Sequence, residues 1–360
     1  MNKTTKMSLT DLGYDNYFES EQKRLGFSEY PVARVIAEYR EAYRVITPEG
    51  EFFAKVTGKQ MFSALSRENY PAVGDFVILD KLFGERAVIH KILSRKTVLT
   101  KKYSNKQDSQ IIATNIDVSF IVESVDRDYN LNRFERYLVL TNEAKIKPII
   151  ILNKIDLISE TELNTKISQI NQRFKGVDII LTSVVTEQGL NILEKSIIRG
   201  KTYCFLGSSG VGKSSLINKL LGKNEIKTKE ISESTGRGKH TTSTRVMHFL
   251  NGGGIVIDNP GTREVGLTDI DVGINEVFDE IILLSRTCKF SDCTHKNEPG
   301  CVVLESVEKG MLDKNKYNNY LKLKKEAEFY EMTDLEKRTK DRKFGKFIKK
   351  AQDMLKNKEL

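Results

Sequence analysis

The sequence has few cysteines and no long apolar run, and both shortages exclude classes of protein. Four cysteines in 360 residues do not make the disulfide framework of a small secreted domain. No apolar stretch is long enough to span a bilayer and no signal-peptide pattern follows Met1, so we expect no membrane partner. The net charge of +9 suits an anionic partner, although solubility alone accounts for part of it.

Three of the four cysteines lie close to one of only four histidines. Cys288, Cys293, His295 and Cys301 supply three thiolates and one imidazole, a set suited to tetrahedral Zn²⁺. Because four protein ligands leave no open position, the predicted ion is structural, and Pro299-Gly300 supplies a turn that brings Cys301 back to it. The alternative is a group of reduced, buried cysteines. Clustering favours a metal in a reducing compartment, and therefore a cytoplasmic protein.

A glycine-rich segment has the pattern of a phosphate-binding loop. It consists of Gly207, Ser208, Ser209, Gly210, Val211, Gly212, Lys213 and Ser214, with Ser215 following. The apolar run Tyr203–Leu206 predicts a buried strand before it, with Cys204 in the core, and Ser214–Leu221 predicts a helix after it. The alternative is a glycine-rich turn that arose by chance, but such a turn would need neither a strand before it nor a helix after it. In this context backbone N–H groups surround the phosphates, Lys213 bridges the β- and γ-phosphates, and Ser214 ligates Mg²⁺.

A second motif predicts recognition of guanine. Asn153-Lys154-Ile155-Asp156 follows the apolar run Pro148–Leu152, which we predict to be a parallel strand. The Asp156 carboxylate can accept hydrogen bonds from two guanine N–H groups, whereas adenine would offer it an acceptor. Ser183 follows another apolar run and matches the loop that backs the base, although a solvated strand end is the plain alternative. The expected ligands are GTP and GDP.

The third motif is Asp258-Asn259-Pro260-Gly261, a D-x-x-G element after the strand Ile255–Ile257. Its position after the phosphate loop predicts that Asp258 and Gly261 sense the γ-phosphate and Mg²⁺. Between the two lies Thr235–Thr242, a polar, basic segment that we expect the ligand to order. The alternative is that this segment is only a flexible connection with no role in catalysis. We favour Thr242 over Thr241 as a Mg²⁺ ligand, and His240 either positions the attacking water, contacts RNA or is simply polar.

These motifs stand in a rotated order, since in an ordinary GTPase the phosphate loop comes first and N-K-x-D last. With the segment Gly236–Thr242 and the Cys/His set, this order resembles the ribosome small-subunit-dependent GTPase A family over nearly the whole chain. The resemblance implies a GTP hydrolase that acts late in small-subunit maturation, binds rRNA and is stimulated by the subunit. Asn259 and Thr262 depart from the family's usual D-[TS]-P-G followed by a hydrophobic residue. No glutamine follows to orient water, as is usual in this family.

The expected fold is multidomain. Residues 1–28 form an N-terminal arm, helical or loosely packed, and residues 29–104 form a small all-β OB-fold barrel for RNA. Residues 105–280 form a circularly permuted α/β P-loop GTPase domain with a mostly parallel sheet, and residues 281–360 form a zinc-binding, helical domain with a basic tail. Short apolar runs predict the barrel strands at Val32–Glu38, Ala42–Ile46, Phe52–Val56 and Asp75–Leu79. Arg95–Lys106 reads as a basic linker and Leu131–Leu138 as the first GTPase helix.

Two basic regions are candidates for RNA contact. On the barrel the candidates are Arg34, Arg40, Arg44, Lys55, Lys59 and Arg67, with an ordinary solvated surface as the alternative. Between Lys337 and Lys358 the chain has ten Lys or Arg against two Asp, and we favour phosphate contact over a merely solvated face.

The leading functional hypothesis is a monomeric GTP hydrolase whose partners are the small ribosomal subunit and its rRNA. One alternative is a permuted GTPase that acts on the large subunit. Another is an RNA-binding scaffold that holds nucleotide without turnover. Asp156 argues against an ATPase or kinase.

Overall fold

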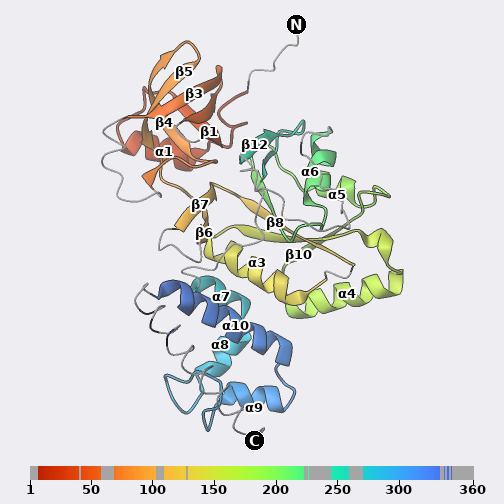
Figure 1. The fold of residues 1–360 in the computed structure, drawn as a ribbon. Helices are drawn as coiled ribbons and strands as arrows, with labels where there is room; N and C mark the ends of the chain where they lie inside the picture. Colours follow the sequence, from red (N-terminus) through yellow and green to blue (C-terminus); the bar gives the residue numbers. More distant parts are fainter. Residues whose placement is uncertain are drawn as a thin grey trace, which may run out of the picture.

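A computed structural model describes residues 7–39, 42–57, 69–102, 109–126, 129–222, 226, 245–258 and 271–332, and the single residues 336, 339 and 342. Figure 1 shows three parts in a row: a β-barrel near the N-terminus, a sheet with helices in the middle, and a helical group toward the C-terminus. Within the part of the chain described, no helix combines the length and apolar character that crossing a membrane requires.

Strands make up the first half and the centre of the chain. They are β1 (Val32–Glu38), β2 (Tyr43–Thr47), β3 (Gly50–Val56), β4 (Phe76–Phe83), β5 (Arg86–Ile92), β6 (Val98–Lys102), β7 (Ser109–Thr114), β8 (Val118–Ser124), β9 (Lys147–Asn153), β10 (Asp178–Thr182), β11 (Thr202–Leu206), β12 (Val246–Phe249) and β13 (Ile255–Asp258). The helices are α1 (Asn16–Arg24), α3 (Leu131–Glu143), the 3₁₀ helix η2 (Ile155–Leu157), α4 (Glu160–Arg173), α5 (Leu190–Lys195), α6 (Lys213–Leu221), α7 (Asp271–Val277), α8 (Asp279–Ser285), α9 (Val302–Glu308) and α10 (Lys314–Glu331).

The first five strands close into a barrel. Their order is β1-β2-β3-β5-β4, and β4 pairs back onto β1 with Val32 opposite Ile78. Alternate side chains point inward, so Val35, Val45 and Ala54 fill the interior while residues between them face outward. This confirms the OB-like barrel. The strand β5 was not predicted, because its charged residues interrupt the apolar pattern.

The central sheet has the order β10-β9-β8-β11-β13-β12, and all of its pairs are parallel except β12 with β13. Cys204 and Leu206 of β11 belong to a core that includes α3, whereas Tyr203 and Phe205 belong to a core that includes α6. The sheet therefore has helices on both faces, and its order confirms the predicted α/β domain with a mostly parallel sheet. Since β8, β9 and β10 precede the phosphate-loop strand β11 in the chain, the fold is circularly permuted.

The N-terminal segment and the supposed linker are both well packed. Phe18 and Leu12 are fully buried, and the helical alternative for the N-terminal segment is confirmed by α1. The prediction of a basic linker is wrong for Val98–Lys102. These residues form β6, which pairs with β7 and buries Leu99, because a paired strand satisfies backbone groups that a linker would leave to water.

Arg34 was predicted on the RNA-binding face, and this prediction is wrong. The residue is only 1% exposed, and its guanidinium lies 5.0 Å from the centre of the Phe76 ring. Arg34 lies on the face of β1 opposite the barrel interior that Ala33 and Val35 fill. The N-terminal segment and the turn before β8 cover that face, and their carbonyls at Leu12 and Asn115 accept from the guanidinium. The candidates Arg40, Lys59 and Arg67 lie outside the described residues, whereas Arg44 and Lys55 are exposed.

The helix α10 fixes the C-terminal group to the central part. Arg136 of α3 makes a two-pronged ion pair with Glu326 of α10, with N–O distances of 2.8 and 2.7 Å. The buried Glu135 accepts from Asn319 of α10 at 2.5 Å and from Arg173 of α4 at 2.7 Å. A buried carboxylate that bonds two other helices fixes their relative positions.

Candidate nucleotide site and metal cluster

The phosphate loop joins the carboxyl end of β11 to the start of α6. Its backbone is left-handed at Gly212 (φ 99°), and a Cβ there would lie 2.3 Å from the Asn153 amide nitrogen. Only glycine fits this approach. Val211 is buried, while Ser209 and Gly210 are exposed at the loop tip, and Ser208, Ser214 and Ser215 are half-buried. The loop therefore presents its backbone at the tip and anchors itself through Val211.

Asn153 connects the guanine motif to the phosphate loop. It is 1% exposed at the end of β9, where its Nδ2 donates to the Val211 carbonyl at 2.8 Å. Its Oδ1 accepts from the Thr182 hydroxyl of β10 at 3.0 Å. The structure thus brings together the guanine motif and the phosphate loop, which lie far apart in the sequence. Both polar atoms of the Asn153 side chain bond to the protein, so this residue supports the loop.

The rest of the predicted base site lies at the same edge of the sheet. Lys154 adopts a left-handed backbone (φ 62°), and its ammonium pairs with Asp126 at 2.9 Å. Asp156 lies in η2 directly after it. Ser183 is buried after β10, and its hydroxyl accepts from the Thr186 N–H at 3.1 Å.

Lys213 and Asp258 are the two charged residues at the phosphate end of this site, close enough for the ammonium to influence the carboxyl. The Lys213 ammonium donates to the carbonyls of Gly207 at 2.7 Å and Ser208 at 2.5 Å. Burial raises the pKa of Asp258 above the usual range, while the nearby His248 and Lys213 partly offset that rise. Gly261 and the candidates His240 and Thr242 lie outside the described residues.

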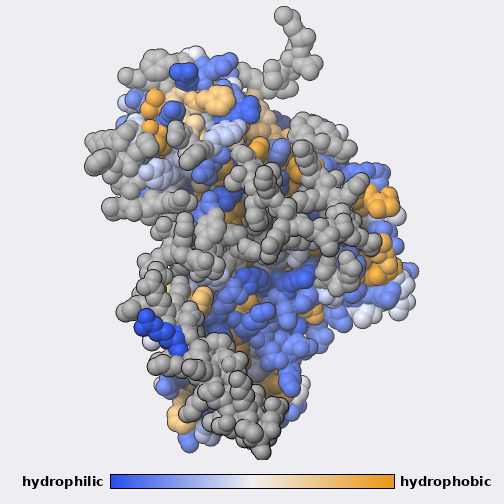
Figure 2. Space-filling model, in the orientation of Figure 1, coloured by the Kyte–Doolittle hydropathy of each residue, from blue (hydrophilic) through white to orange (hydrophobic). Residues whose placement is uncertain are grey.

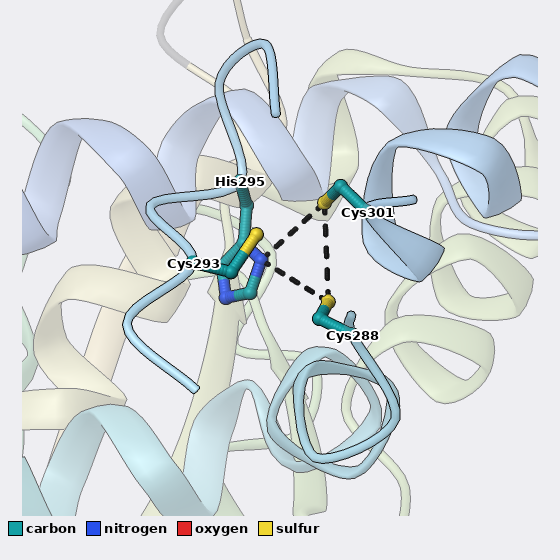
Figure 3. Close-up of side chains that lie close together, drawn as sticks. All are labelled: Cys288, Cys293, His295 and Cys301. Atoms are coloured by element: carbon teal, nitrogen blue, oxygen red, sulfur yellow. Dashed lines mark hydrogen bonds between the residues drawn. The ribbon is translucent and has the colours of Figure 1, made fainter. Parts of the chain in front are cut away.

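The four predicted metal ligands converge in the C-terminal group. Their donor atoms all lie within 4.8 Å of one another (Figure 3). The Cys288 and Cys301 sulfurs are 4.0 Å apart, and His295 Nδ1 lies 3.7 and 3.5 Å from them. Metal–sulfur bonds of about 2.3 Å at tetrahedral angles would place two sulfurs about 3.8 Å apart. Donor set and spacing therefore fit a tetrahedral metal ion.

The surrounding chain holds these ligands in place. His295 has a left-handed backbone (φ 60°), and its carbonyl accepts from the Tyr317 hydroxyl of α10 at 2.6 Å. Burial raises the pKa of the Cys301 thiol to about 11, so a bound cation would be needed to make it a thiolate at neutral pH. The cluster is thus attached to α10 through the hydrogen bond between His295 and Tyr317, and α10 in turn packs on α3.

Comparison with known proteins assigns the family. The family model described as RsgA GTPase matches residues 92–268. A relative from Bacteroides thetaiotaomicron, the small ribosomal subunit biogenesis GTPase RsgA 1, is 38% identical over 94% of both chains. The RsgA 2 protein of Lactiplantibacillus plantarum is 42% identical over 87% of this chain and 89% of its own length.

The chain belongs to the RsgA GTPase family.

Two solved structures share the fold of this RsgA family member. YjeQ from Thermotoga maritima has a TM-score of 0.60 and 28% identity, covering 84% of this chain and 98% of YjeQ. YloQ, described as a circularly permuted GTPase, has a TM-score of 0.57 and 23% identity, covering 84% of this chain and 97% of YloQ. Membership makes this chain a GTP-hydrolysing enzyme.

Two residues near the site of this RsgA GTPase were missing from the sequence prediction. Asp126 pairs with Lys154, and the only available signal was its place just after the strand β8. His248 lies opposite Val256 on the neighbouring strand β12, and its charge lowers the pKa of Asp258. Neither residue lies inside a motif, so neither pattern nor spacing indicated them.

Proposed function

We propose that this protein is a GTP hydrolase that acts in assembly of the small ribosomal subunit. The observation that carries the proposal is the close relationship, over nearly the full length, to proteins named small ribosomal subunit biogenesis GTPases. Its partners are then the small subunit and its rRNA, and it works as a cytoplasmic monomer. The clustered thiols suit that reducing compartment.

The proposed base site uses the side chains at the end of β9. Asp156 accepts from the two guanine N–H groups, and Lys154 flanks the base while Asp126 holds its ammonium. Ser183 backs the base from the loop after β10. Asn153 acts indirectly, because its amide holds the phosphate loop at Val211. The site rejects adenine, which would place an acceptor against the exposed Asp156 carboxylate.

The proposed phosphate chemistry is in-line attack by water on GTP. The loop residues 207–212 offer backbone N–H groups, and Lys213 neutralises charge on the β- and γ-phosphates. Ser214 and Asp258, with Thr242, would hold Mg²⁺, which supplies further charge neutralisation when bound. Gly261 would bond the γ-phosphate through its N–H. His240 would help to position water.

The proposed metal is one structural Zn²⁺ held by the four ligands of the cluster. Three thiolates and an imidazole are the ligands that Zn²⁺ prefers, and no ligand position is left for catalysis. Its role is to hold the segment between α8 and α9 against α10.

RNA contact is proposed at both ends of the molecule. On the outer face of the barrel, Arg44 lies opposite Phe53 and Phe53 opposite Arg86, and the Phe53 ring is 52% exposed. Cations beside an exposed aromatic ring are typical of surfaces that stack single-stranded bases. Figure 2 shows a hydrophilic surface over the α3 and α10 side of the molecule. The exposed cations of the described C-terminal group include Arg286, Lys289, Lys296, Lys322 and Lys325, and the basic tail follows in the sequence.

The test is GTP hydrolysis measured alone, with purified small subunits and with purified large subunits. We expect slow turnover alone, because no glutamine follows the D-x-x-G element. Small subunits should accelerate it, by as much as about 10³-fold if they order or supply a group at the phosphates. Large subunits should not.

Lys213→Ala should abolish turnover in every condition, whereas Lys219→Ala, on the same helix but paired with the exposed Glu187, should not. Stimulation by large subunits alone would support the large-subunit alternative. Equal turnover with and without either subunit would overturn the proposal.

A further inference from the structure

One row of residues crosses from the barrel to the nucleotide site. Ala37 of β1 lies opposite Val246 of β12, and Val246 lies opposite Asp258 of β13. The barrel and the central sheet therefore form one eleven-stranded sheet, in which β1 is the shared strand. Only β12 separates the barrel from the Asp258 carboxylate.

The strand β12 depends on both of its neighbours. It has four residues, and Val246 is its first. A short strand at the edge of a sheet frays easily, because half of its backbone groups have no partner strand. Val246 has β1 on one side and β13 on the other, whereas the described pairings of the other three β12 residues are with β13 alone. Removing β1 would leave Val246 at an open edge, directly beside Asp258.

Arg34 fixes β1 to the central part of the molecule. Its guanidinium donates to the carbonyls of Leu12 at 2.6 Å, Gly74 at 3.3 Å and Asn115 at 3.2 Å. These carbonyls belong to the N-terminal segment, the barrel, and the turn before β8. Because a buried guanidinium needs such acceptors, the three segments cannot separate without leaving it unsatisfied. Arg34 is thus a joint between three parts of the chain.

A second buried group strengthens this joint. Asp75 of the barrel accepts from the Thr114 hydroxyl of β7 at 2.6 Å and from Arg95 at 2.8 and 2.7 Å. At the surface, Asp11 pairs with Arg199 at 2.6 Å. Fully bonded polar networks are rigid, so the barrel is held in one position relative to the central sheet.

We propose that β1 of the barrel is a positioning element for Asp258, and that Arg34 is the residue that holds β1 in place. A partner bound to the barrel can then influence the Mg²⁺ end of the nucleotide site through a single strand. The inference rests on the Mg²⁺ role proposed for Asp258.

The experiment compares Arg34→Met with Arg24→Met in the full-length protein. Both remove one guanidinium, but Arg24 lies exposed at the end of α1, where it pairs with Glu21. Arg34→Met should raise the Mg²⁺ concentration for half-maximal GTP hydrolysis by about threefold to tenfold, the size of effect seen for residues that couple two sites. Its GDP affinity without Mg²⁺ should not change, because β9 and β11 carry that site. Amide exchange should accelerate in β12 and β13 but not in β8.

A disulfide between β1 and β12 should restore the function lost in the Arg34→Met variant. Residues opposite each other in antiparallel strands have Cα atoms about 4.5–5.5 Å apart, which suits a disulfide. In the Arg34→Met background, oxidised Ala37→Cys/Val246→Cys should restore the Mg²⁺ dependence of the wild type, and reduction should abolish the rescue. If Arg34→Met does not fold, Arg34→Lys, which keeps the charge but loses the fork of donors, takes its place.

Three outcomes would overturn the inference: the same Mg²⁺ dependence in the Arg34 and Arg24 variants, unchanged exchange in β12, or no rescue by the oxidised crosslink. If small subunits fail to stimulate the wild type, the proposed function fails, but these measurements on the isolated protein still decide the role of β1.

Discussion

At the scale of single residues, Asp156 is expected to decide which base is bound. Asp156→Asn replaces an acceptor of two hydrogen bonds with an amide that can donate to the extra oxygen of xanthine. We expect GTP affinity to fall at least about a hundredfold and xanthosine triphosphate affinity to rise, since unpaired buried polar groups are costly. Competition binding with both nucleotides measures this.

Asp178→Asn is the matched control for that substitution. Asp178 begins β10 at an exposed position where it pairs with Lys147, so it loses the same charge outside the site. Unchanged GTP affinity in the Asp156 variant would remove the basis for assigning guanine recognition to it.

Asp258 gives the protein a dependence of stability on pH. Burial raises the pKa of this carboxyl, so between its unfolded pKa of about 3.9 and the raised folded pKa the folded chain holds a proton that the unfolded chain has lost. The resulting stabilisation is present below the unfolded pKa and is lost as the pH rises through the folded one. Without nucleotide, Asp258→Asn should therefore gain stability relative to the wild type when the pH is raised from a value near the unfolded pKa to neutrality.

Urea unfolding at the two pH values measures this difference, with Asp178→Asn again as the control. A wild type and an Asp258→Asn variant whose stabilities change in parallel with pH would contradict the burial of the Asp258 carboxyl.

At the scale of elements, the proposed zinc ion is expected to hold the segment between α8 and α9 in place. Cys293→Ser should reduce bound zinc from one ion per chain to nearly none, because three ligands bind Zn²⁺ far more weakly than four. Amide exchange should accelerate around residues 288–303, while α10 stays protected through its ion pair with Arg136. Elemental analysis and exchange mass spectrometry measure the two effects.

Ser291→Ala, an exposed position on the same segment, should change neither quantity. Nucleotide affinity should also persist in the Cys293 variant, since the phosphate loop lies on β11 and α6. Protein purified without metal that nevertheless keeps normal protection of residues 288–303 would argue against a structural zinc.

At the scale of the whole molecule, the barrel has two separate proposed roles, RNA contact and the positioning of Asp258. Deleting it would remove the proposed RNA face and also take β1 away from β12, so a deletion cannot distinguish them. Phe53→Ala acts on the outer face alone. It should weaken binding to small subunits about tenfold or more, as loss of a stacking ring does, and leave hydrolysis by the isolated protein unchanged.

Ile192→Ala on α5, another exposed apolar side chain far along the chain from the barrel, is the control. Co-sedimentation with small subunits over a range of salt concentrations gives both affinities. Equal binding by the Phe53 variant and the wild type would show that the aromatic face is only a solvated surface.

The sequence by itself determined the chemistry of the motifs and the class of fold. The phosphate loop, the guanine motif and the Cys/His set are short, and each residue's role depends on neighbours within a few positions. The same holds for β1, β9 and β11, whose apolar patterns are local and were predicted close to their observed bounds. The start of α3 was also predicted, but the helix continues past the predicted end at Leu138 to Glu143. The permuted order was also visible in the chain, since it is a property of the order itself.

Only the tertiary structure decided which distant residues meet. Asn153 bonds to Val211, and Arg34 bonds to Asn115, through contacts that no local pattern encodes. An arginine on a strand reads as a surface residue, and Arg34 is buried because three carbonyls from distant segments surround its guanidinium. The pairing of β1 with β12 likewise depends on how the barrel and the central sheet dock. The hydrogen-bonding groups of a strand edge are the same in every sequence, so no local pattern predicts this pairing.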